Sequence, residues 1–289
     1  MKPFAVLVGL ALTFASSQIS AQSAPCGIGM PACEVPLGTY RLALPEAPPT
    51  ANGYPALIFF HGAGGTGEQS LKNADMVNAF LARGYAVIAP DGMPRPNSRF
   101  GSGWSFHPDR EKQRDEMAFT REVLEDAADR HSIDRDRIIM GGFSIGGSLT
   151  WYLACQDNSV AAAYAPVAGA FWRPHPVASD CSGPVRMFHT HGWRDETVPL
   201  EGRPLRDGAI LQGDVFYSLG VIRELNGCNQ LRADGYQTDD KYWVRWWTRC
   251  APDTALRFAL HTGGHMIPEG WADMTMDWFE GLEGMDGSY

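Results

Sequence analysis

The sequence predicts one α/β domain with a mostly parallel central sheet and helices on both of its faces. Two observations support this prediction. Short apolar runs recur along the chain, and segments with helical periodicity separate them. Strands that alternate with helices usually pair in parallel, and helices then bury both faces of the sheet. The chain has 289 residues, without repeats or an internal linker, which is enough for the core of one such domain.

The first half of the chain contains two predicted strands and two predicted helices. A buried strand is expected over 55–60, followed by a glycine-rich loop and a helix around 71–83. The next strand covers 85–89. A long helix follows near 114–131, since apolar side chains recur there at the spacing of one helical face.

The second half continues the alternation up to a terminal helix. Strands are predicted over 137–140, 161–166, 185–189 and 256–261, and the helix over 271–279. Each of these strands is a short apolar run, as expected for strands in the middle of a covered sheet.

The N-terminal residues resemble a secretory signal peptide. One lysine precedes an apolar run over 5–15, and small residues extend to Ser20-Ala21. The run is short for a membrane span. We therefore expect residues 1–21 to be removed, and residues 22–289 to form one domain that is extracellular or periplasmic and has no stable membrane anchor.

The number of cysteines is typical of an exported protein. The chain has six, and an even number in an exported protein favours disulfides over free thiols. Proximity along the chain suggests three pairs, although the sequence alone leaves the connectivity open. The suggested pairs are Cys26 with Cys33, Cys155 with Cys181, and Cys228 with Cys250.

The charge of the chain argues against nucleic acid as a partner. The formal net charge is −9 at pH 7, and the sequence contains no basic stripe that could contact phosphates.

One glycine-rich hexapeptide indicates a nucleophile. It reads Gly142-Phe143-Ser144-Ile145-Gly146-Gly147 and lies between the predicted strand 137–140 and a helical segment. In the arrangement strand, G-x-S-x-G, helix, the serine lies at a sharp turn with its hydroxyl exposed. Glycine is needed beside it because strand and helix approach too closely for a Cβ. The free N–H groups of the helix point toward the reacting centre.

Two later residues complete a predicted triad. A serine hydroxyl is a poor nucleophile at neutral pH, so it needs a base and a group that orients the base. Asp195 and His265 each lie in a loop directly after a predicted strand, in the chain order Ser, acid, His. For the acid, the alternative is that Asp195 has a structural role and Glu196 is the acid. For the base, the alternative is His261. His261 lies within a strand pattern and is expected to be structural.

The glycine-rich segment His61-Gly62-Ala63-Gly64-Gly65-Thr66-Gly67 directly follows the strand over 55–60. We predict an oxyanion hole formed by the backbone N–H groups of Ala63 and Ile145. A phosphate-binding loop is the alternative. However, no Gly-Lys-Ser/Thr ends the segment, and no acid follows the next strand in the dinucleotide-binding pattern.

Eight motifs in this order carry a resemblance to a known family. They are His61–Gly65, Gly101-Ser102-Gly103-Trp104-Ser105-Phe106, Asp134–Arg137, Gly142–Gly147, Leu153-Ala154-Cys155, His191-Gly192-Trp193-Arg194-Asp195, Asn226-Gly227-Cys228 and Gly264-His265. Taken together, they resemble the polyhydroxybutyrate depolymerase and feruloyl esterase group of secreted α/β-hydrolases, from about Gly38 to Trp278. The resemblance implies an α/β-hydrolase fold, a Ser144–His265–Asp195 triad and a disulfide between Cys228 and Cys250. Many relatives have Cys in place of Ala63 and Ala in place of Ile145, but the predicted donors are backbone groups.

We therefore expect residues 22–289 to be the catalytic domain of a secreted serine carboxylic-ester hydrolase. The expected substrates are hydroxybutyrate esters or oligomers of the polyhydroxyalkanoate type, or alternatively feruloyl or acetyl-xylan esters of plant cell walls. A serine peptidase or a non-catalytic binding protein on the same fold are alternatives of other classes. We expect a monomer without a cofactor. We also expect no metal site, because His189 and His191 lack a third ligand at suitable spacing.

Two aromatic features have roles that the sequence leaves open. Trp104, in the loop over 99–108, is a candidate wall of an acyl pocket, or else a hydrophobic residue of a lid without substrate contact. The aromatic segment 242–247 could be a platform for a polymer or glycan. Its period-two alternation predicts instead a strand packed between cysteine-anchored segments.

Overall fold

The structure is a computed structural model that describes residues 26–27, 29–95 and 101–283. The predicted signal peptide, residues 1–21, lies outside the described residues. Within them, no helix combines the length and hydrophobicity needed to cross a bilayer.

A ten-stranded sheet runs through the described part of the chain. Its six middle strands are parallel, and two antiparallel strands extend it at each end. This confirms the predicted mostly parallel sheet. In spatial order the strands are β1 (Cys33–Val35), β2 (Gly38–Ala43), β4 (Ala86–Pro90), β3 (Tyr54–Phe60), β7 (Ile133–Phe143), β8 (Ala163–Val167), β10 (Arg186–Gly192), β15 (Ala255–His261), β14 (Tyr242–Trp247) and β13 (Gly235–Thr238).

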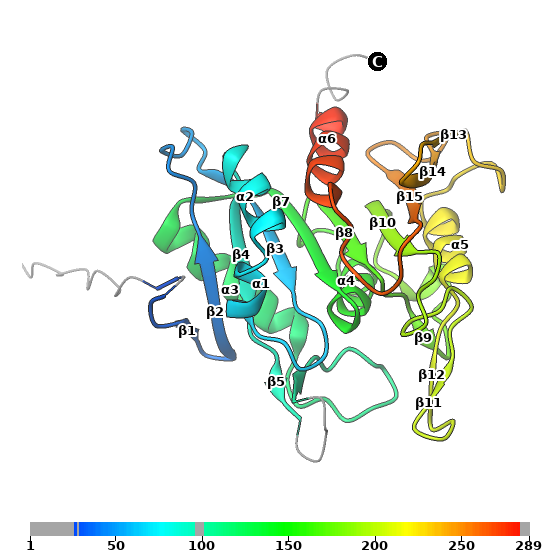
Figure 1. The fold of residues 1–289 in the computed structure, drawn as a ribbon, viewed down its shortest axis with the longest axis horizontal. Coiled ribbons are helices and arrows are strands. Elements are labelled where there is room, and N and C mark those ends of the chain that lie inside the picture. The colour runs from blue at the N-terminus through cyan, green and yellow to red at the C-terminus, as the bar shows by residue number, and fades with distance from the viewer. Residues whose placement is uncertain (1–25, 28, 96–100, 284–289) are drawn as a thin grey trace, which may run out of the picture.

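Helices cover both faces of this sheet (Figure 1). One face packs against α1 (Gly67–Leu71), α2 (Ala74–Ala82) and α6 (Trp271–Glu283). The other packs against α3 (Glu116–His131), α4 (Ile145–Gln156) and α5 (Val215–Leu225).

Strand β3 shows why the central strands are apolar on both sides. Ala56, Ile58 and Phe60 belong to the core on the α3 and α4 side, and Leu57 and Phe59 to the core on the α2 and α6 side. All five side chains are buried. A continuous apolar run is therefore needed, because both faces of a parallel strand are covered.

Short elements complete the described chain. The loops contain a small three-stranded sheet, a two-stranded sheet with two residues in each strand, and one 3₁₀ helix. These elements are β11 (Pro204–Leu205), β12 (Ile210–Gln212) and β9 (Trp172–Arg173), then β5 (Met93–Pro94) with β6 (Ser102–Gly103), and η1 (Ala178–Asp180).

The predicted helix around 71–83 is confirmed as α2, which begins three residues later than predicted. The separate short helix α1 ends at Leu71, and α2 follows Asn73, whose side chain accepts a hydrogen bond from the Met76 N–H at 3.3 Å. An asparagine side chain competes with the helical backbone for its N–H groups and favours a cap over a helix interior. Strands β1 and β2 and helix α5 have no counterpart among the predicted elements.

The cysteines are joined in the three pairs that proximity suggests. Cys26–Cys33 ties the start of the described chain to β1. Cys155–Cys181 connects the end of α4 to η1, and Cys228–Cys250 links the segments after α5 and β14. Each bond closes a short loop and restricts the unfolded chain. All six side chains thus support export to an oxidising compartment.

Candidate active site

The turn between β7 and α4 presents Ser144 at the carboxyl edge of the sheet. Ser144 has φ 58° and ψ −121°, a sparsely populated conformation for a residue with a side chain. Such strain costs about 1–3 kcal/mol and is typical of functional turns. A Cβ on Gly146 would lie 2.1 Å from the Phe60 oxygen, and one on Gly142 would lie 2.4 Å from the Gly146 oxygen. The packing therefore requires glycine at both positions.

The structure brings Ser144, His265 and Asp195 together in a continuous chain of hydrogen bonds. The Ser144 hydroxyl lies 2.9 Å from His265 Nε2, and His265 Nδ1 lies 2.8 Å from Asp195 Oδ2. The three side chains follow β7, β15 and β10, whose carboxyl ends meet at one edge because these strands are parallel. The Phe143 ring packs against the His265 ring, with centroids 4.7 Å apart.

The loop after β10 holds the Asp195 carboxylate in its ionised form. Its Oδ1 accepts hydrogen bonds from the N–H groups of Thr197 and Val198, at 2.9 and 2.8 Å. Burial alone would raise the pKa of Asp195, but the hydrogen bonds from His265 and Val198 outweigh it and lower the pKa. Glu196, the competing acid, is exposed.

The glycine-rich loop lies against the serine. A Cβ on Gly62 would lie 3.4 Å from Ser144 Cβ, which places the loop next to the nucleophile. Residues 62–65 form a turn in this loop, since the Gly65 N–H donates to the Gly62 oxygen. Among the described residues, no acceptor takes up the N–H of Ala63 or of Ile145. Ile145 is the first residue of α4, where N–H groups have no partner within the helix.

The segment after residue 100 holds this glycine-rich loop in place. The Ser102 hydroxyl donates to the Gly65 oxygen, and the Gly64 N–H donates to the Ser102 oxygen. The Trp104 indole N–H donates to the His61 oxygen at 2.8 Å. Trp104 is buried and packs edge-on against Phe60. It therefore supports the loop from within the core, and its burial argues against the predicted role as a pocket wall.

His61 also has a structural role that the sequence did not indicate. Its Nδ1–H donates to the Gly62 oxygen at 2.7 Å, and its Nε2 accepts from the Gly92 N–H at 2.9 Å. Burial lowers the pKa of His61, so the ring stays neutral and keeps this tautomer. Its position directly after a central strand was the available sequence signal.

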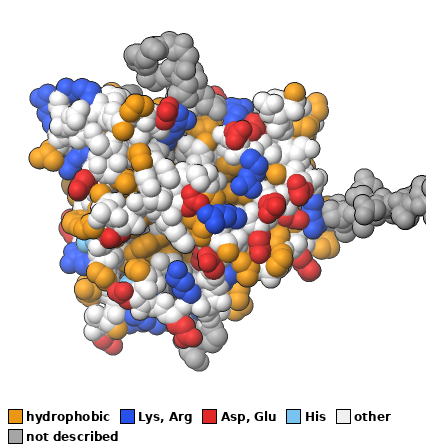
Figure 2. Space-filling view, turned by 180° about the vertical axis from the view of Figure 1, so that it is seen from behind, with side chains coloured by type: hydrophobic (Ala, Val, Ile, Leu, Met, Phe, Trp, Pro, Cys, Tyr) orange, Lys and Arg blue, Asp and Glu red, His pale blue; other side chains and the backbone are white. Residues whose placement is uncertain are grey.

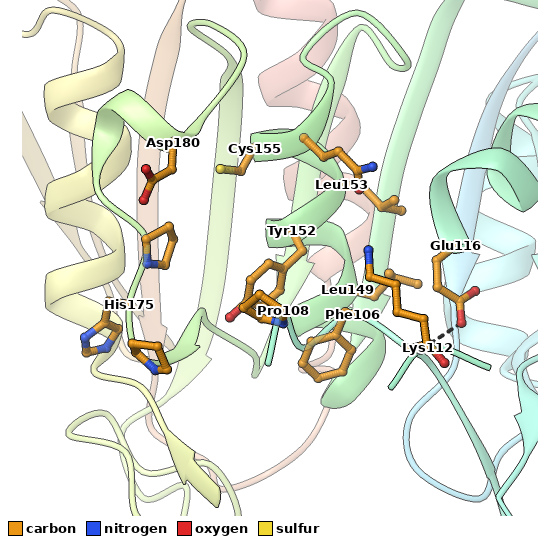
Figure 3. A pocket seen from close by; sticks show the side chains of 14 residues that line it. Phe106, Pro108, Lys112, Glu116, Leu149, Tyr152, Leu153, Cys155, His175 and Asp180 are labelled. Atoms are coloured by element: carbon orange, nitrogen blue, oxygen red, sulfur yellow. Dashed lines mark hydrogen bonds between the residues drawn. The ribbon is translucent and has the colours of Figure 1, made fainter. Parts of the chain in front are cut away.

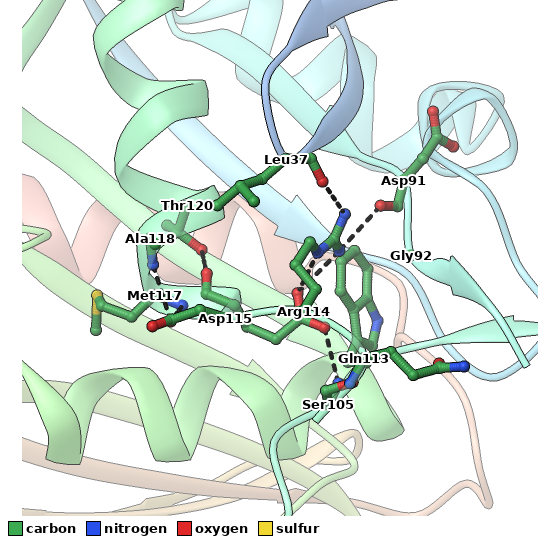
Figure 4. Close-up of polar contacts among 12 residues, drawn as sticks. Leu37, Asp91, Gly92, Ser105, Gln113, Arg114, Asp115, Met117, Ala118 and Thr120 are labelled. Atoms are coloured by element: carbon green, nitrogen blue, oxygen red, sulfur yellow. Dashed lines mark hydrogen bonds and ion pairs between the residues drawn. The ribbon is translucent and has the colours of Figure 1, made fainter. Parts of the chain in front are cut away.

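Arg114 and Glu116 form a buried ion pair near Trp104, and Figure 4 shows Arg114 among its polar contacts. The Arg114 guanidinium donates to Glu116 Oε2 from Nε and Nη2, at 3.0 and 2.8 Å, and lies 5.6 Å from the Trp104 ring. It also donates to the backbone oxygens of Leu37 and Asp91. Burial raises the pKa of Glu116 and lowers that of Arg114, so each charge depends on its partner.

Removing one member of this pair should destabilise the fold strongly. Glu116→Ala leaves a buried guanidinium without its counter-charge, which is expected to cost about 3–5 kcal/mol of unfolding free energy in urea titrations. Glu269→Ala is the control, because it breaks the exposed pair with Lys241 and should cost less than about 1 kcal/mol. Equal losses in the two variants would contradict the role given to the buried pair.

Two buried histidines on β10 support the Asp195 loop. The His191 Nε2–H donates to the Val198 oxygen at 2.8 Å, and His189 Nε2 lies 3.0 Å from His191 Nδ1. His189 Nδ1 lies 3.1 Å from the Pro166 oxygen. Burial lowers the pKa of His191 to about 4 and that of His189 well below its usual value. Their ring nitrogens thus contact one another and backbone oxygens.

His191 should make the fold sensitive to acid. Its pKa is about 4 when folded and 6.5 when unfolded. Between these values the unfolded chain binds the extra proton, so stability falls as the pH drops, by about 1.4 kcal/mol per pH unit. Urea unfolding at pH 7 and pH 5 should show a loss of about 2 kcal/mol from this residue. His191→Asn should remove that part of the slope, and an unchanged slope would contradict the assignment.

A cavity of about 540 Å³ lies beside α4 (Figure 3). Phe106 and Tyr152 stack in its wall, with ring centroids 5.4 Å apart, and Lys112, His175 and Asp180 add polar groups. None of the triad side chains lines it. The loop over 99–108 thus reaches this cavity through Phe106 and its neighbours, whereas Trp104 does not line it.

One cluster of potential metal ligands occurs among the described residues. It consists of Cys26, Cys33 and His131. The two sulfur atoms are joined in a disulfide, so they do not offer thiolate ligands there.

Comparisons with known proteins identify the family and the fold of this chain. A family model described as phospholipase/carboxylesterase matches residues 47–207. Feruloyl esterase B of Piromyces equi is 29% identical over 182 residues, which span 60% of this chain but only 33% of that protein. Feruloyl esterase D of Neurospora crassa is 23% identical over 223 residues, 71% of each chain. An acetyl xylan esterase from Aspergillus awamori shares the fold, with a TM-score of 0.61 and 15% identity over 84% of this chain and 94% of its own.

Proposed function

The chain belongs to the phospholipase/carboxylesterase family of α/β-hydrolases, and we propose that it is an exported serine esterase that transfers acyl groups to water. The observation that carries this proposal is the contact chain from the Ser144 hydroxyl through His265 to Asp195, at 2.9 and 2.8 Å. These distances are within the reach that a nucleophile and its base require. The three disulfides support export, since such bonds persist in oxidising compartments.

In the first half of the reaction, Ser144 Oγ attacks the ester carbonyl carbon while His265 Nε2 takes its proton. Asp195 holds the imidazole in the tautomer with hydrogen on Nδ1 and stabilises the imidazolium that forms. The N–H groups of Ala63 and Ile145 bind the oxyanion, and removing one such donor typically costs about 10²-fold or more in rate. The C–O bond then breaks, and His265 gives its proton to the leaving alkoxide.

In the second half, water replaces the alcohol. His265 removes a proton from water, whose oxygen attacks the acyl carbon attached to Ser144. The bond to Oγ breaks, the proton returns to Ser144, and the carboxylic acid leaves. No cofactor takes part in either half of this scheme, because the protein supplies nucleophile, base and oxyanion donors.

We favour acyl groups carried by plant cell-wall polysaccharides as the substrates, in particular ferulate and acetate. The relatives named feruloyl esterase, which align over up to 78% of this chain, support this choice. Hydroxybutyrate oligomers are the second candidate, because the sequence motifs also resemble polyhydroxybutyrate depolymerases.

A substrate panel tests the proposal. It contains p-nitrophenyl butyrate, methyl ferulate, acetylated xylo-oligosaccharides, hydroxybutyrate trimer and a peptide anilide. We expect turnover of the esters, with the highest kcat/KM on ferulate or acetyl groups, and none of the peptide. Higher kcat/KM on the trimer would favour the second candidate, and cleavage of the peptide would favour a peptidase.

A fluorophosphonate probe tests whether the site is catalytic at all. The probe reacts with an activated serine, so it should label the wild-type chain once, at Ser144. Ser159→Ala is a suitable control, because this serine is exposed and lies outside the triad. Absence of labelling on the folded wild-type protein would favour a non-catalytic binding protein.

A further inference from the structure

Strands β13 and β14 form the end of the sheet opposite β1 and β2 (Figure 1). Large aromatic side chains on and next to these two strands are exposed. Trp193 is 57% exposed, Trp243 40%, Tyr236 79% and Phe216 50%. We call these four residues the aromatic platform. Exposed apolar side chains that gather in one area usually mark a binding surface.

The strand register places members of the platform on one face of the sheet. Opposite residues in an antiparallel pair share a face, and Trp243 pairs with Thr238 while Arg245 pairs with Tyr236. Trp193 packs edge-on against Trp243, with centroids 6.0 Å apart. Polar and aromatic side chains therefore alternate across this exposed face.

Helix α5 extends the platform on the same face. The ring of Phe216 packs edge-on against Phe258, with centroids 5.9 Å apart, and Phe258 pairs directly with Arg245. The other face of β14 is buried, since Tyr242 and Val244 contribute to the core. The segment 242–247 is thus a packed strand, as its alternation predicts. Trp243 and Arg245 on its second face are exposed, whereas Trp247 on that face is buried in the core.

The platform is bonded to the loops that carry the triad. The Trp193 N–H donates to the His261 oxygen at 2.8 Å, and the Arg194 N–H donates to the Gly263 oxygen at 3.0 Å. Arg194 Nε also donates to the Thr262 oxygen. Trp193 lies two residues before Asp195, and these bonds join its loop to the segment leading to His265. A polymer on Trp193 would therefore contact the loop that carries Asp195.

We propose that the aromatic platform binds the backbone of a neutral polysaccharide whose ester substituents enter the active site; this inference rests on the proposed esterase function. Pyranose rings present apolar C–H faces that pack on aromatic rings, and their hydroxyls need polar partners at the ring edges. Arg245 and Thr238 supply donors and acceptors between the rings. A net charge of −9 opposes a polyanionic chain, and the alternating polar groups suit a hydroxylated polymer better than a polyester.

Binding to insoluble xylan tests the platform independently of catalysis. All variants carry Ser144→Ala, so that retention on xylan does not depend on turnover. Trp243→Ala with Tyr236→Ala should weaken retention by about tenfold or more, because large aromatic residues often dominate binding energies. Trp243→Phe keeps a ring and should restore much of the retention. Leu44→Ala is the control, since Leu44 is exposed directly after β2, at the other end of the sheet.

A second readout separates binding from a structural effect. With Ser144 present, Trp243→Ala with Tyr236→Ala should lower kcat/KM on acetylated xylan about tenfold and leave kcat/KM on p-nitrophenyl acetate within twofold. An equal loss on both substrates, unchanged xylan retention, or retention on polyester film but not on xylan would overturn the proposal. A shift from dimer to monomer in the double variant, with xylan retention unchanged, would identify a self-association surface instead and also overturn it. If the wild type shows no ester turnover while the double variant still loses xylan retention, the esterase proposal fails and the platform stands.

Discussion

Ser144→Ala is expected to lower kcat on p-nitrophenyl butyrate by roughly 10⁴-fold or more. The variant lacks the oxygen that His265 Nε2 contacts at 2.9 Å, so no acyl-enzyme can form. The oxyanion donors remain, because they belong to the backbone, and they account for the small residual rate. Initial rates over a range of substrate concentrations measure kcat directly.

The fold should survive this substitution. Alanine retains the Cβ and the strained backbone conformation with φ 58°, so the melting temperature should stay close to that of the wild type. Ser159→Ala is the matched control and should leave kcat within about twofold, because Ser159 lies in the turn after α4. Full activity of the Ser144 variant would refute the proposed mechanism.

Asp195→Asn should lower kcat by about 10³- to 10⁴-fold at neutral pH, with less effect on KM. The amide oxygen can still accept from the N–H groups of Thr197 and Val198, so the loop keeps its shape. The amide NH₂ would then face His265 Nδ1 and force the ring proton onto Nε2. In that tautomer the ring cannot take a proton from Ser144.

Glu196→Gln is the control for the acid. Glu196 is exposed and adjacent in sequence, and it was the competing candidate, so its substitution should leave kcat within about twofold. A large loss in this variant combined with a small loss in Asp195→Asn would reverse the assignment of the acid.

Much of the fold could be predicted because its central strands are short apolar runs between turns. Strand β3 is buried on both faces, and the sequence over 55–60 is therefore apolar throughout. Strand β2 has a mixed pattern and lies toward the edge of the sheet, so no run of apolar residues marks it. Helix α5 is different, because Val215, Leu219 and Ile222 recur at helical spacing and are buried, so the sequence did contain a signal for this helix.

The site could be predicted in part for a related reason. Ser144 lies at a turn whose geometry needs glycine nearby, and such local demands leave a motif in the sequence. Trp104 lies in an equally recognisable motif, but its neighbours in space are distant in sequence: the His61 oxygen, Phe60 and Arg114. Its role as a support for the glycine-rich loop could therefore be read only from the folded chain.

Strand β14 shows one feature that the sequence determined and one that it left open. Its alternation determined that one face would be buried, because side chains of a strand point to opposite sides. Whether the other face is covered depends on which elements pack there, and Trp193 reaches it from a loop beyond β10.

By itself, then, the sequence determined the central strands, most of the covering helices, the nucleophile turn and the candidates for the triad. The strands, the helices and the turn depend on backbone geometry over a few residues, which composition and spacing express directly. Only the tertiary structure decided that Ser144, His265 and Asp195 are in hydrogen-bond contact, and that Trp193 and Trp243 pack together in a region that stays exposed. The physical reason is that the triad contacts join residues 70 and 121 positions apart, so they depend on strand order and loop packing rather than on any local pattern.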